Sequence, residues 1–426
     1  MIARMLPLLL LAACATASRA PAPTAFSTVS APVEFIAFGD TGYRTDYLDA
    51  EDLTPPLTEA QFAAAARARW IKDRRPPGGF TLPPTLQVAT PAGPVTVAAS
   101  GLLPTARAMD AWCTTKARCQ FGVMLGDNIY PDGATMGADG RDDGQRFIDM
   151  FVEPYGKFGW GNPDFRLYTV LGNHDWHTSR AAAMAQVKFH ETTRPFHMDG
   201  IAYDAIPGGT GGQVEVFALD THVLLAGETV LDGSLAVDGS EIATTAIDTS
   251  EPWATPATPA ERAMVANLEA RLKASRARWK IVIGHHPLWA SSGGKFQQSR
   301  SLRAALLPVL CRNADLYFAG HEHTLELATD DCTTAVPGIR LPPLPVIVSG
   351  AAGKQRPLNT AFMAHQNRNN PQYQAIYARG MVWGFAHVTL AGDRATVVMV
   401  ATGNDGKGGT RVVATQDFAR RSGLLK

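Results

Sequence analysis

Short apolar segments alternate with longer amphipathic segments along most of the chain. The apolar segments are rich in β-branched and aromatic residues and are nearly continuous, which predicts strands that are covered on both faces. The expected strands are 33–38, 121–125, 167–171, 214–219, 279–283, 315–319 and 346–349.

The amphipathic segments between these strands carry helix start signals. Thr58 and Thr258 each begin a capping box, which predicts helices over 58–72 and 258–277. Because strands alternate with helices, the pattern predicts a layered α/β domain. Further helices are expected at 105–116, 144–151, 181–191 and 302–311.

Three other stretches depart from this alternation. Segments 384–390 and 395–401 have only a short turn between them, which predicts an antiparallel hairpin near the end of the domain. Residues 43–100 are rich in proline and contain one expected helix and a hairpin around 91–94, whereas residues 226–257 are rich in Gly, Thr, Ser and Asp. We expect both stretches to be surface insertions in a single domain that spans 33–426.

The N-terminus has the layout of an export signal. Residues 1–13 place one arginine before an apolar run that is too short to span a bilayer, which predicts a signal peptide. The run ends in Leu-Ala-Ala-Cys14, which resembles the bacterial lipobox and favours acylation of Cys14 over an ordinary signal peptide with an incidental cysteine. Residues 14–32 then predict a flexible tether. We expect a lipid-anchored protein of the bacterial cell envelope, at the outer membrane or in the periplasm, whose N-terminal lipid is its membrane contact.

The chain has five cysteines, and the lipobox accounts for the odd one. In an exported protein the remaining four can form disulfides, for which three pairings exist. We favour Cys113–Cys119 and Cys311–Cys332 because each pair is near in sequence, with four buried free thiols as the alternative. A CxxC pattern is absent from the sequence, which argues against structural zinc.

Composition narrows the possible function. The chain has 39 Lys and Arg residues against 39 Asp and Glu residues, and 46% of its residues are hydrophobic. This balance excludes disorder caused by charge repulsion, and it argues against a general nucleic-acid binder because there is no excess of basic residues. The function must therefore lie in a local site.

Candidate chemistry appears where the expected strands end. Five of them are followed by glycine and then by a potential metal ligand. In an open α/β sheet, ligands bind outside the carboxyl ends of the strands, and glycine lets the backbone bend sharply there, so we expect these side chains to converge on a metal site. The five blocks are Gly39-Asp40, Gly126-Asp127-Asn128-Ile129-Tyr130, Gly172-Asn173-His174-Asp175, Gly284-His285-His286-Pro287 and Gly320-His321-Glu322-His323.

The donor types indicate more than one metal ion. Two carboxylates, an amide, three imidazoles and a phenol are too many for one four-coordinate zinc. They suit two cations that share a carboxylate. Imidazole suits iron and zinc, and a phenolate oxygen suits ferric iron.

These blocks resemble those of the calcineurin-like metallophosphoesterases. Tyr130 in Gly-Asp-Asn-x-Tyr makes the chain most similar to the short, mammalian-type purple acid phosphatases, and the resemblance extends from residue 33 to about 420. It implies an α/β fold in which a layered β-sandwich is flanked by helices (α-β-β-α), with the active site at the carboxyl ends of the strands.

The resemblance also implies a role for each candidate ligand. One set would hold a ferric ion, a second set would hold zinc, manganese or ferrous iron, and one carboxylate would bridge the two ions. The ferric set is Asp40, Tyr130 and His323, the second set is Asn173, His285 and His321, and the bridging residue is Asp127.

Further residues would act around the metals. The resemblance implies that His174 contacts the phosphate and protonates the leaving group, while Asp175 would orient His174 through its other ring nitrogen. His286 replaces an aromatic residue of the relatives and is not expected to be a ligand, and Glu322 is expected to point away from the metals. Lys354 and Arg356 follow a strand and would either contact phosphate or lie in a solvated loop, which is the interpretation we favour.

The resulting hypothesis is a two-metal hydrolase of phosphate monoesters, of the acid phosphatase type. The cations would lower the pKa of a bound water, and the metal-bound hydroxide would attack phosphorus in line. The expected partner is a small phosphorylated substrate. One alternative is a phosphodiesterase on the same scaffold. The other is a non-catalytic surface lipoprotein, against which the complete ligand set argues.

Overall fold

The computed structural model describes residues 31–421, apart from 49–52, 54–57 and 339. The signal peptide expected at 1–13, the lipidation site Cys14 and most of the tether expected at 14–32 lie outside the described residues. Residues Pro32–Lys426 group into one compact unit, which carries all the described helices and strands.

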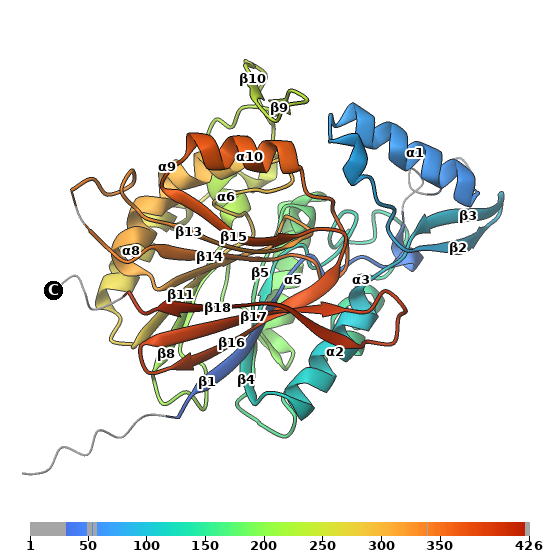
Figure 1. The fold of residues 1–426 in the computed structure, drawn as a ribbon. Coiled ribbons are helices and arrows are strands. Elements are labelled where there is room, and N and C mark those ends of the chain that lie inside the picture. The colour runs from blue at the N-terminus through green and yellow to red at the C-terminus, as the bar shows by residue number, and fades with distance from the viewer. Residues whose placement is uncertain (1–30, 49–52, 54–57, 339, 422–426) are drawn as a thin grey trace, which may run out of the picture. The chain divides into compact units, whose positions relative to one another are not determined.

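Two mixed sheets form the framework of this unit (Figure 1). The first sheet contains β1 (Val33–Phe38), β4 (Cys119–Leu125), β5 (Leu167–Val170), β6 (Phe196–His197), β16 (Trp383–Ala391), β17 (Arg394–Thr402) and β18 (Thr410–Ala419). Its strand order is β18-β17-β16-β1-β4-β5-β6. Strands β1, β4, β5 and β6 run parallel, and the C-terminal strands β16, β17 and β18 extend the sheet in antiparallel pairs.

The second sheet has the order β15-β13-β14-β12-β11-β8-β7. Strands β8, β11, β12 and β14 run parallel at its centre, with antiparallel strands at both edges. Its strands are β7 (Ala202–Ala205), β8 (Val214–Leu219), β11 (Trp279–Ile283), β12 (Leu316–Ala319), β13 (Leu325–Asp330), β14 (Leu344–Ser349) and β15 (Tyr373–Arg379).

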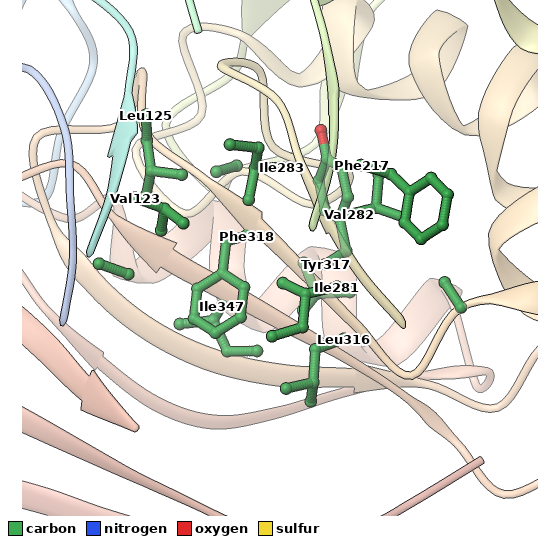
Figure 2. Close-up of a cluster of buried hydrophobic side chains, with 14 of the residues drawn as sticks. Val123, Leu125, Phe217, Ile281, Val282, Ile283, Leu316, Tyr317, Phe318 and Ile347 are labelled. Atoms are coloured by element: carbon green, nitrogen blue, oxygen red, sulfur yellow. The ribbon is translucent and has the colours of Figure 1, made fainter. Parts of the chain in front are cut away.

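The two sheets pack face to face through their apolar side chains. Phe35 and Val123 of the first sheet belong to the same buried cluster as Phe318 and Ile347 of the second, and the rings of Phe35 and Phe318 meet edge to face with centroids 5.7 Å apart. Figure 2 shows this cluster, in which side chains of β4 lie beside those of β11 and β12. The strands are covered on both faces, as the continuous apolar segments predicted, and they form the sandwich that the family resemblance implied.

Helices cover the outer faces of both sheets. Ile36 points from β1 into a separate cluster with Met109 of α2, and Leu306 of α9 packs on the second sheet. Successive side chains of β1 point alternately to the two faces of the sheet. Because both faces are covered, odd-numbered and even-numbered positions of the strand are both apolar. The helices are α1 (Glu59–Lys72), α2 (Leu102–Thr115), α3 (Asp143–Phe147), α4 (Glu153–Tyr155), α5 (Arg180–Thr192), α6 (Thr221–Ala226), α7 (Pro259–Arg262), α8 (Met264–Ala274), α9 (Phe296–Asn313) and α10 (Thr360–Asn369).

Helix starts were predicted better than helix continuity. The capping box at Thr58 is formed, since its hydroxyl accepts from the Gln61 amide and the Gln61 side chain accepts from the Thr58 amide. The single helix expected over 258–277 is wrong, because Ala263 leaves helical geometry (φ −97°, ψ 13°) and separates α7 from α8. Five strands of the two large sheets were not predicted, namely β6, β7, β13, β15 and β18.

Both stretches expected as insertions contain short two-stranded sheets. The first has the hairpin of β2 (Thr85–Thr90) and β3 (Gly93–Ala98), and the second has β9 (Ser234–Leu235) and β10 (Glu241–Ile242). The first hairpin also contributes buried residues, because its Val95 and Val97 form a small core with Tyr43 and Tyr130.

Two disulfides link elements of the unit. Cys113 bonds to Cys119 and Cys311 bonds to Cys332, with Cα–Cα distances of 5.4 and 5.8 Å. This is the pairing favoured from sequence proximity, and it leaves neither pair as free thiols. Among the described residues, none of the helices combines the length and the apolar character needed to cross a membrane.

The buried histidine His190 on α5 should make the fold sensitive to acid. Its ring packs against Phe151 and Phe196, and within the described residues neither ring nitrogen has a hydrogen-bond partner. Burial lowers the pKa of His190 to about 3. Because the unfolded histidine takes up a proton near pH 6.5, the native state loses stability as the pH falls from there towards 3, by about 1.4 kcal/mol per unit.

We expect His190→Leu to raise the free energy of unfolding by about 1–3 kcal/mol at pH 7.5, because it removes unpaired buried nitrogens. The gain should grow as the pH falls below 6.5, as measured by urea unfolding at several pH values. His190→Gln is the matched control, since it keeps a polar group but does not titrate. A gain for His190→Leu that is the same at every pH would contradict the prediction.

Candidate metal centre

The five glycine-containing turns follow β1, β4, β5, β11 and β12, so they come from the carboxyl ends of strands in both sheets. Contacts between the turns show the convergence directly. The backbone amide of His321, after β12, donates to Oδ2 of Asp40, after β1, at 2.8 Å. Nδ1 of His285, after β11, lies 2.8 Å from the carbonyl oxygen of Leu125 at the end of β4. Residues separated by up to 283 positions in the sequence are thus brought to one point.

Several of the candidate metal ligands have left-handed backbone conformations, which set the direction of their side chains. Asp40 has φ 56°, Asp127 has φ 51° and His321 has φ 66°. Such values are disfavoured for residues with a Cβ and are typical of functional sites whose surroundings hold them in place. Of the five turn glycines, Gly126 has a positive φ (87°) and the other four do not. The expectation that glycine supplies the bend at every turn is therefore wrong.

The other glycines are needed for space. A Cβ atom on Gly172 would lie 2.2 Å from Oδ1 of Asp127, and one on Gly320 would lie 2.6 Å from Oδ2 of Asp40. These separations are far shorter than van der Waals contact. The glycines therefore allow the backbone to approach the carboxylates closely.

One group of donors surrounds the Tyr130 hydroxyl. This oxygen lies 3.0 Å from Oδ1 of Asp40, 2.7 Å from Oδ2 of Asp127 and 3.1 Å from Nε2 of His323. The donor atoms of Asp40, Asp127 and His323 lie within 4.8 Å of one another, and all three residues are buried. The Tyr130 phenol has one proton, so it can donate a hydrogen bond to only one of these three neighbours at a time.

A second group of donors surrounds Nε2 of His285. This nitrogen lies 3.1 Å from Nδ1 of His321, 3.3 Å from Oδ1 of Asn173 and 3.3 Å from Oδ1 of Asp127. Because Nδ1 of His285 donates to the Leu125 carbonyl, the neutral ring presents a lone pair at Nε2. Nitrogen and oxygen atoms that can act as metal ligands are therefore crowded together in this group.

Asp127 belongs to both groups, with Oδ2 towards the first and Oδ1 towards the second. The electrostatics match a site that attracts positive charge. Burial lowers the pKa of His285, but the Asp127 and Asp40 carboxylates more than reverse this and raise it to about 9. Burial opposes ionisation of Asp127, yet the imidazoles of His285 and His174 hold its pKa well below the usual range.

Other groups at the site are kept neutral by burial. It raises the pKa of Asp40 well above its usual range against the opposing charge of His285, and it raises the pKa of Tyr130 as well. The raised pKa values of Asp40, Tyr130 and His285 mean that protons are held among these crowded oxygen and nitrogen atoms, in positions that cations can take over. The two donor groups fit two cations that share the Asp127 carboxylate.

His174 lies beside both groups without belonging to either. Its backbone amide donates to Oδ1 of Asp127 at 3.0 Å, and its ring packs against the Tyr130 ring with centroids 4.3 Å apart. Nδ1 lies 2.6 Å from the carbonyl oxygen of Pro131, which fixes the proton on Nδ1 and leaves Nε2 for another partner. Burial lowers the pKa of His174 to about 4.

The expected contact between Asp175 and His174 is not formed. Both carboxylate oxygens of Asp175 instead accept from backbone amides, namely those of Asn128 (3.0 and 3.1 Å), Ile129 (3.1 Å) and Gly172 (2.8 Å). These amides point into the interior and need an acceptor, and the Pro131 carbonyl has already taken Nδ1 of His174. Asp175 therefore fixes the turns that carry Asp127 and Asn173, and its predicted role as the orienting partner of His174 is wrong.

Two basic residues that we placed in a solvated loop lie at the site, so that interpretation is wrong. Nζ of Lys354 lies 4.4 Å from the centre of the Tyr130 ring. Arg356 is half-buried and donates through Nη1 to the His321 carbonyl at 3.1 Å and to Glu322 at 3.2 Å. Both residues follow β14 at the same edge of the sheet as the metal-ligand candidates. This position after a strand was the one feature of the sequence that could have placed them at the site.

The remaining residues of the motifs have other partners. His286 places Nδ1 2.8 Å from the Thr221 hydroxyl and belongs to neither donor group, and Glu322 pairs with Arg356. Gln298 was not foreseen, although its Oε1 lies 3.1 Å from Nε2 of His321 and leaves Nδ1 of that ring for the second donor group. Nothing near Gln298 in the sequence marks it as part of the site.

We expect Asp175→Asn to lower the free energy of unfolding by about 2–4 kcal/mol, because an amide cannot accept from all the amides that face the carboxylate. It should also lower the metal content, since the turns holding Asp127 and Asn173 loosen. Urea unfolding and metal analysis measure both effects. Asp132→Asn is the matched control, as Asp132 is an exposed acid near the site. A variant that loses turnover but keeps full stability would instead support a role through His174.

Comparisons with known proteins agree with this geometry. Residues 108–325, about half of the chain, match the family model described as Calcineurin-like phosphoesterase. The chain is 30% identical over 240 residues to purple acid phosphatase 17 of Arabidopsis thaliana, which covers 56% of this chain and 60% of that protein. It is 23% identical over 286 residues to tartrate-resistant acid phosphatase type 5 of Mus musculus, covering 66% of this chain and 74% of that protein.

A solved structure shares the fold. Purple acid phosphatase PPD1 from yellow lupin (Lupinus luteus) seeds superposes with a TM-score of 0.50 at 14% identity, covering 92% of this chain and 54% of that one. The chain thus spans about 60% of the Arabidopsis protein and about half of the lupin protein. The family match, the two-sheet fold and the buried donor groups lead to one conclusion: the chain belongs to the calcineurin-like phosphoesterases, as a metallophosphoesterase related to the purple acid phosphatases.

Proposed function

We propose that this phosphoesterase hydrolyses phosphate monoesters, as an acid phosphatase with two metal ions. The observation that carries the proposal is the Asp127 carboxylate shared between two buried donor groups, one of which includes the Tyr130 hydroxyl. The names of the relatives in the comparisons, acid phosphatases of plants and mouse, agree with it.

Each donor group would hold one cation. Asp40, Tyr130 and His323 would bind a ferric ion, because a phenolate oxygen favours that metal. Zinc, manganese or ferrous iron would occupy the second position, with Asp127 shared between the two. When bound, the cations would lower the pKa of a coordinated water and neutralise the phosphate oxygens. The ligands of the second position would be Asn173, His285 and His321.

The residues around the donor groups would position the ester. Nδ1 of His174 is committed to the Pro131 carbonyl, so Nε2 would face the leaving group. The doubly protonated ring, which forms at acid pH, would deliver the Nε2 proton and keep the Nδ1 proton. The ammonium group of Lys354, which lies over the Tyr130 ring, would attract the phosphate towards the first donor group. Both roles need no covalent bond between enzyme and substrate.

We also propose that the protein is exported and anchored by an acylated Cys14, which rests on the layout of residues 1–14 alone. In a bacterial host we expect the mature protein to begin at Cys14, to carry fatty acid and to fractionate with the membrane. Cys14→Ser should abolish the acyl mass and release the protein. Intact-mass measurement of both forms tests this, and a mature wild-type chain that lacks both lipid and Cys14 would contradict it.

The proposed reaction is tested by comparing p-nitrophenyl phosphate with its bis ester from acid to alkaline pH, using metal-replete Cys14→Ser protein. We expect kcat/KM to be at least tenfold higher for the monoester, with an optimum at acid pH. The same preparation should contain iron and show the visible absorption of a ferric phenolate. Preference for the bis ester would identify a phosphodiesterase instead.

His174→Ala is the informative variant in this comparison. Because His174 lies in neither donor group, both metals should stay bound, while kcat for the monoester should fall by about 10²–10⁴-fold through loss of the proton donor. Metal analysis supplies the control. Unchanged turnover at full metal content would refute the role of His174, and loss of metal would show that it supports the donor groups.

A further inference from the structure

A strongly basic cleft lies next to the metal centre. Its volume is about 390 Å³, and it is bordered by the end of α1, by β9, by the loop 291–295 and by the segment after β14. The charged residues among its lining are six cations and one carboxylate, namely Arg69, Lys72, Arg74, Arg75, Lys295, Arg356 and Asp73.

This accumulation of charge is unusual for the molecule. The whole chain carries equal numbers of basic and acidic residues, so its general field does not predict a basic cleft. The lining carboxylate of Asp73 lies 3.6 Å from Nε of Arg75. The positive charges of Arg69, Lys72 and Lys295 therefore exceed what this acid can neutralise. A cavity with such an excess attracts an anion.

The cleft is connected to the metal centre through two of its cations. Arg356 donates to the carbonyl of His321, one of the proposed ligands. Lys295 also lines a neighbouring cavity of about 210 Å³ together with Asn173 and Gln298. An ester whose phosphate lies at the donor groups can therefore extend towards the basic cleft with the rest of its structure.

Hydrogen bonds fix the wall that α1 contributes. Nη1 of Arg75 donates to the carbonyl of Pro357 at 2.8 Å, and Nη1 of Arg74 donates to the carbonyl of Leu235 at 3.0 Å. The end of α1, from the first insertion, is thus joined to the second insertion and to the segment that carries Arg356. The two insertions create a cleft that the central sheets alone would not have.

We propose that this cleft binds a second anionic group of the substrate, so that the preferred substrate is a small ester with a further phosphate besides the one that is cleaved. Arginine and lysine side chains are the usual partners of phosphate, and several of them around one cavity favour a group with two charges. The inference rests on the proposed phosphatase activity for the position of the cleaved phosphate. It adds the chemical class of the substrate.

Glucose 1,6-bisphosphate and glucose 6-phosphate provide a matched pair of substrates. We expect kcat/KM to be at least tenfold higher for the bisphosphate. In the double variant Arg69→Gln/Lys72→Gln, this advantage should fall to about twofold or less through a higher KM, while kcat/KM for p-nitrophenyl phosphate stays within twofold of wild type. Both substituted residues are exposed on α1 and lie outside the two donor groups.

Arg67→Gln is the control for a general effect of charge. It removes one cation from the same helix, but the Arg67 guanidinium lies over the Phe80 ring at 4.3 Å and does not line the cleft. The control should keep the preference for the bisphosphate. Equal kcat/KM for the two sugar phosphates in wild type would overturn the proposal, as would an equal loss of preference in the control.

A binding measurement separates this proposal from the proposed reaction. Propane-1,3-bisphosphonate has no ester to cleave, and calorimetric titration of the metal-replete protein should show a dissociation constant about tenfold higher in the double variant than in wild type. Methylphosphonate, with one anionic group, should bind both proteins equally. If no ester is hydrolysed but the double variant still binds the bisphosphonate more weakly than wild type, the proposed reaction is refuted and the proposed anion site in the cleft is supported. If the monoester is hydrolysed without any such difference, the cleft proposal fails alone.

Discussion

The arrangement at Asp127 is the constraint on which the rest of the structure depends. This buried carboxylate directs one oxygen to the Tyr130 hydroxyl and the other to Nε2 of His285, and each of these atoms has further oxygen or nitrogen atoms within 3.3 Å. Burying unpaired polar groups costs several kcal/mol unless positive charge compensates them. Cation binding would therefore be linked to the ordering of the strand-end turns, because the donor atoms proposed to hold the metals are otherwise held near one another at a cost.

The sandwich supplies the rigidity that this arrangement requires. Phe35 of β1 packs against Phe318 of β12, so the strands that lead to Asp40 and to His321 are held together only a few residues before those ligands begin. Both ligands have left-handed backbones, which cost of order 1–3 kcal/mol each. A well-packed core can sustain that strain, since separating the two strands would expose a continuous apolar layer. Fold stability and site geometry thus share the same contacts.

The sequence was informative where one local signal decides the structure. Strand ends, glycines and the donor residues after them could be recognised because the carboxyl ends of parallel strands meet at one edge. Features that depend on which atoms find each other across the fold could not be recognised in this way. The partners of Asp175 are amides of two different turns, and Arg356 pairs with Glu322. Helix α7 separates from α8 at Ala263, although alanine has the highest helix propensity. In each case, contacts with residues that are distant in the sequence outweigh the local sequence pattern.

The two insertions bear on which phosphate esters the site can accept. Six of the seven proposed ligands lie within the matched residues 108–325, and Asp40 precedes them. The donor groups account for the proposed reaction without specifying the substrate. The hairpin of the first insertion packs Val95 and Val97 against Tyr130, and the end of α1 adds cations beside Lys295. Both segments belong to the first insertion and lie outside the two large sheets. The preference among phosphate esters would then depend on these segments, while the buried donor atoms, whose loss would leave their neighbours unpaired, would support the reaction itself.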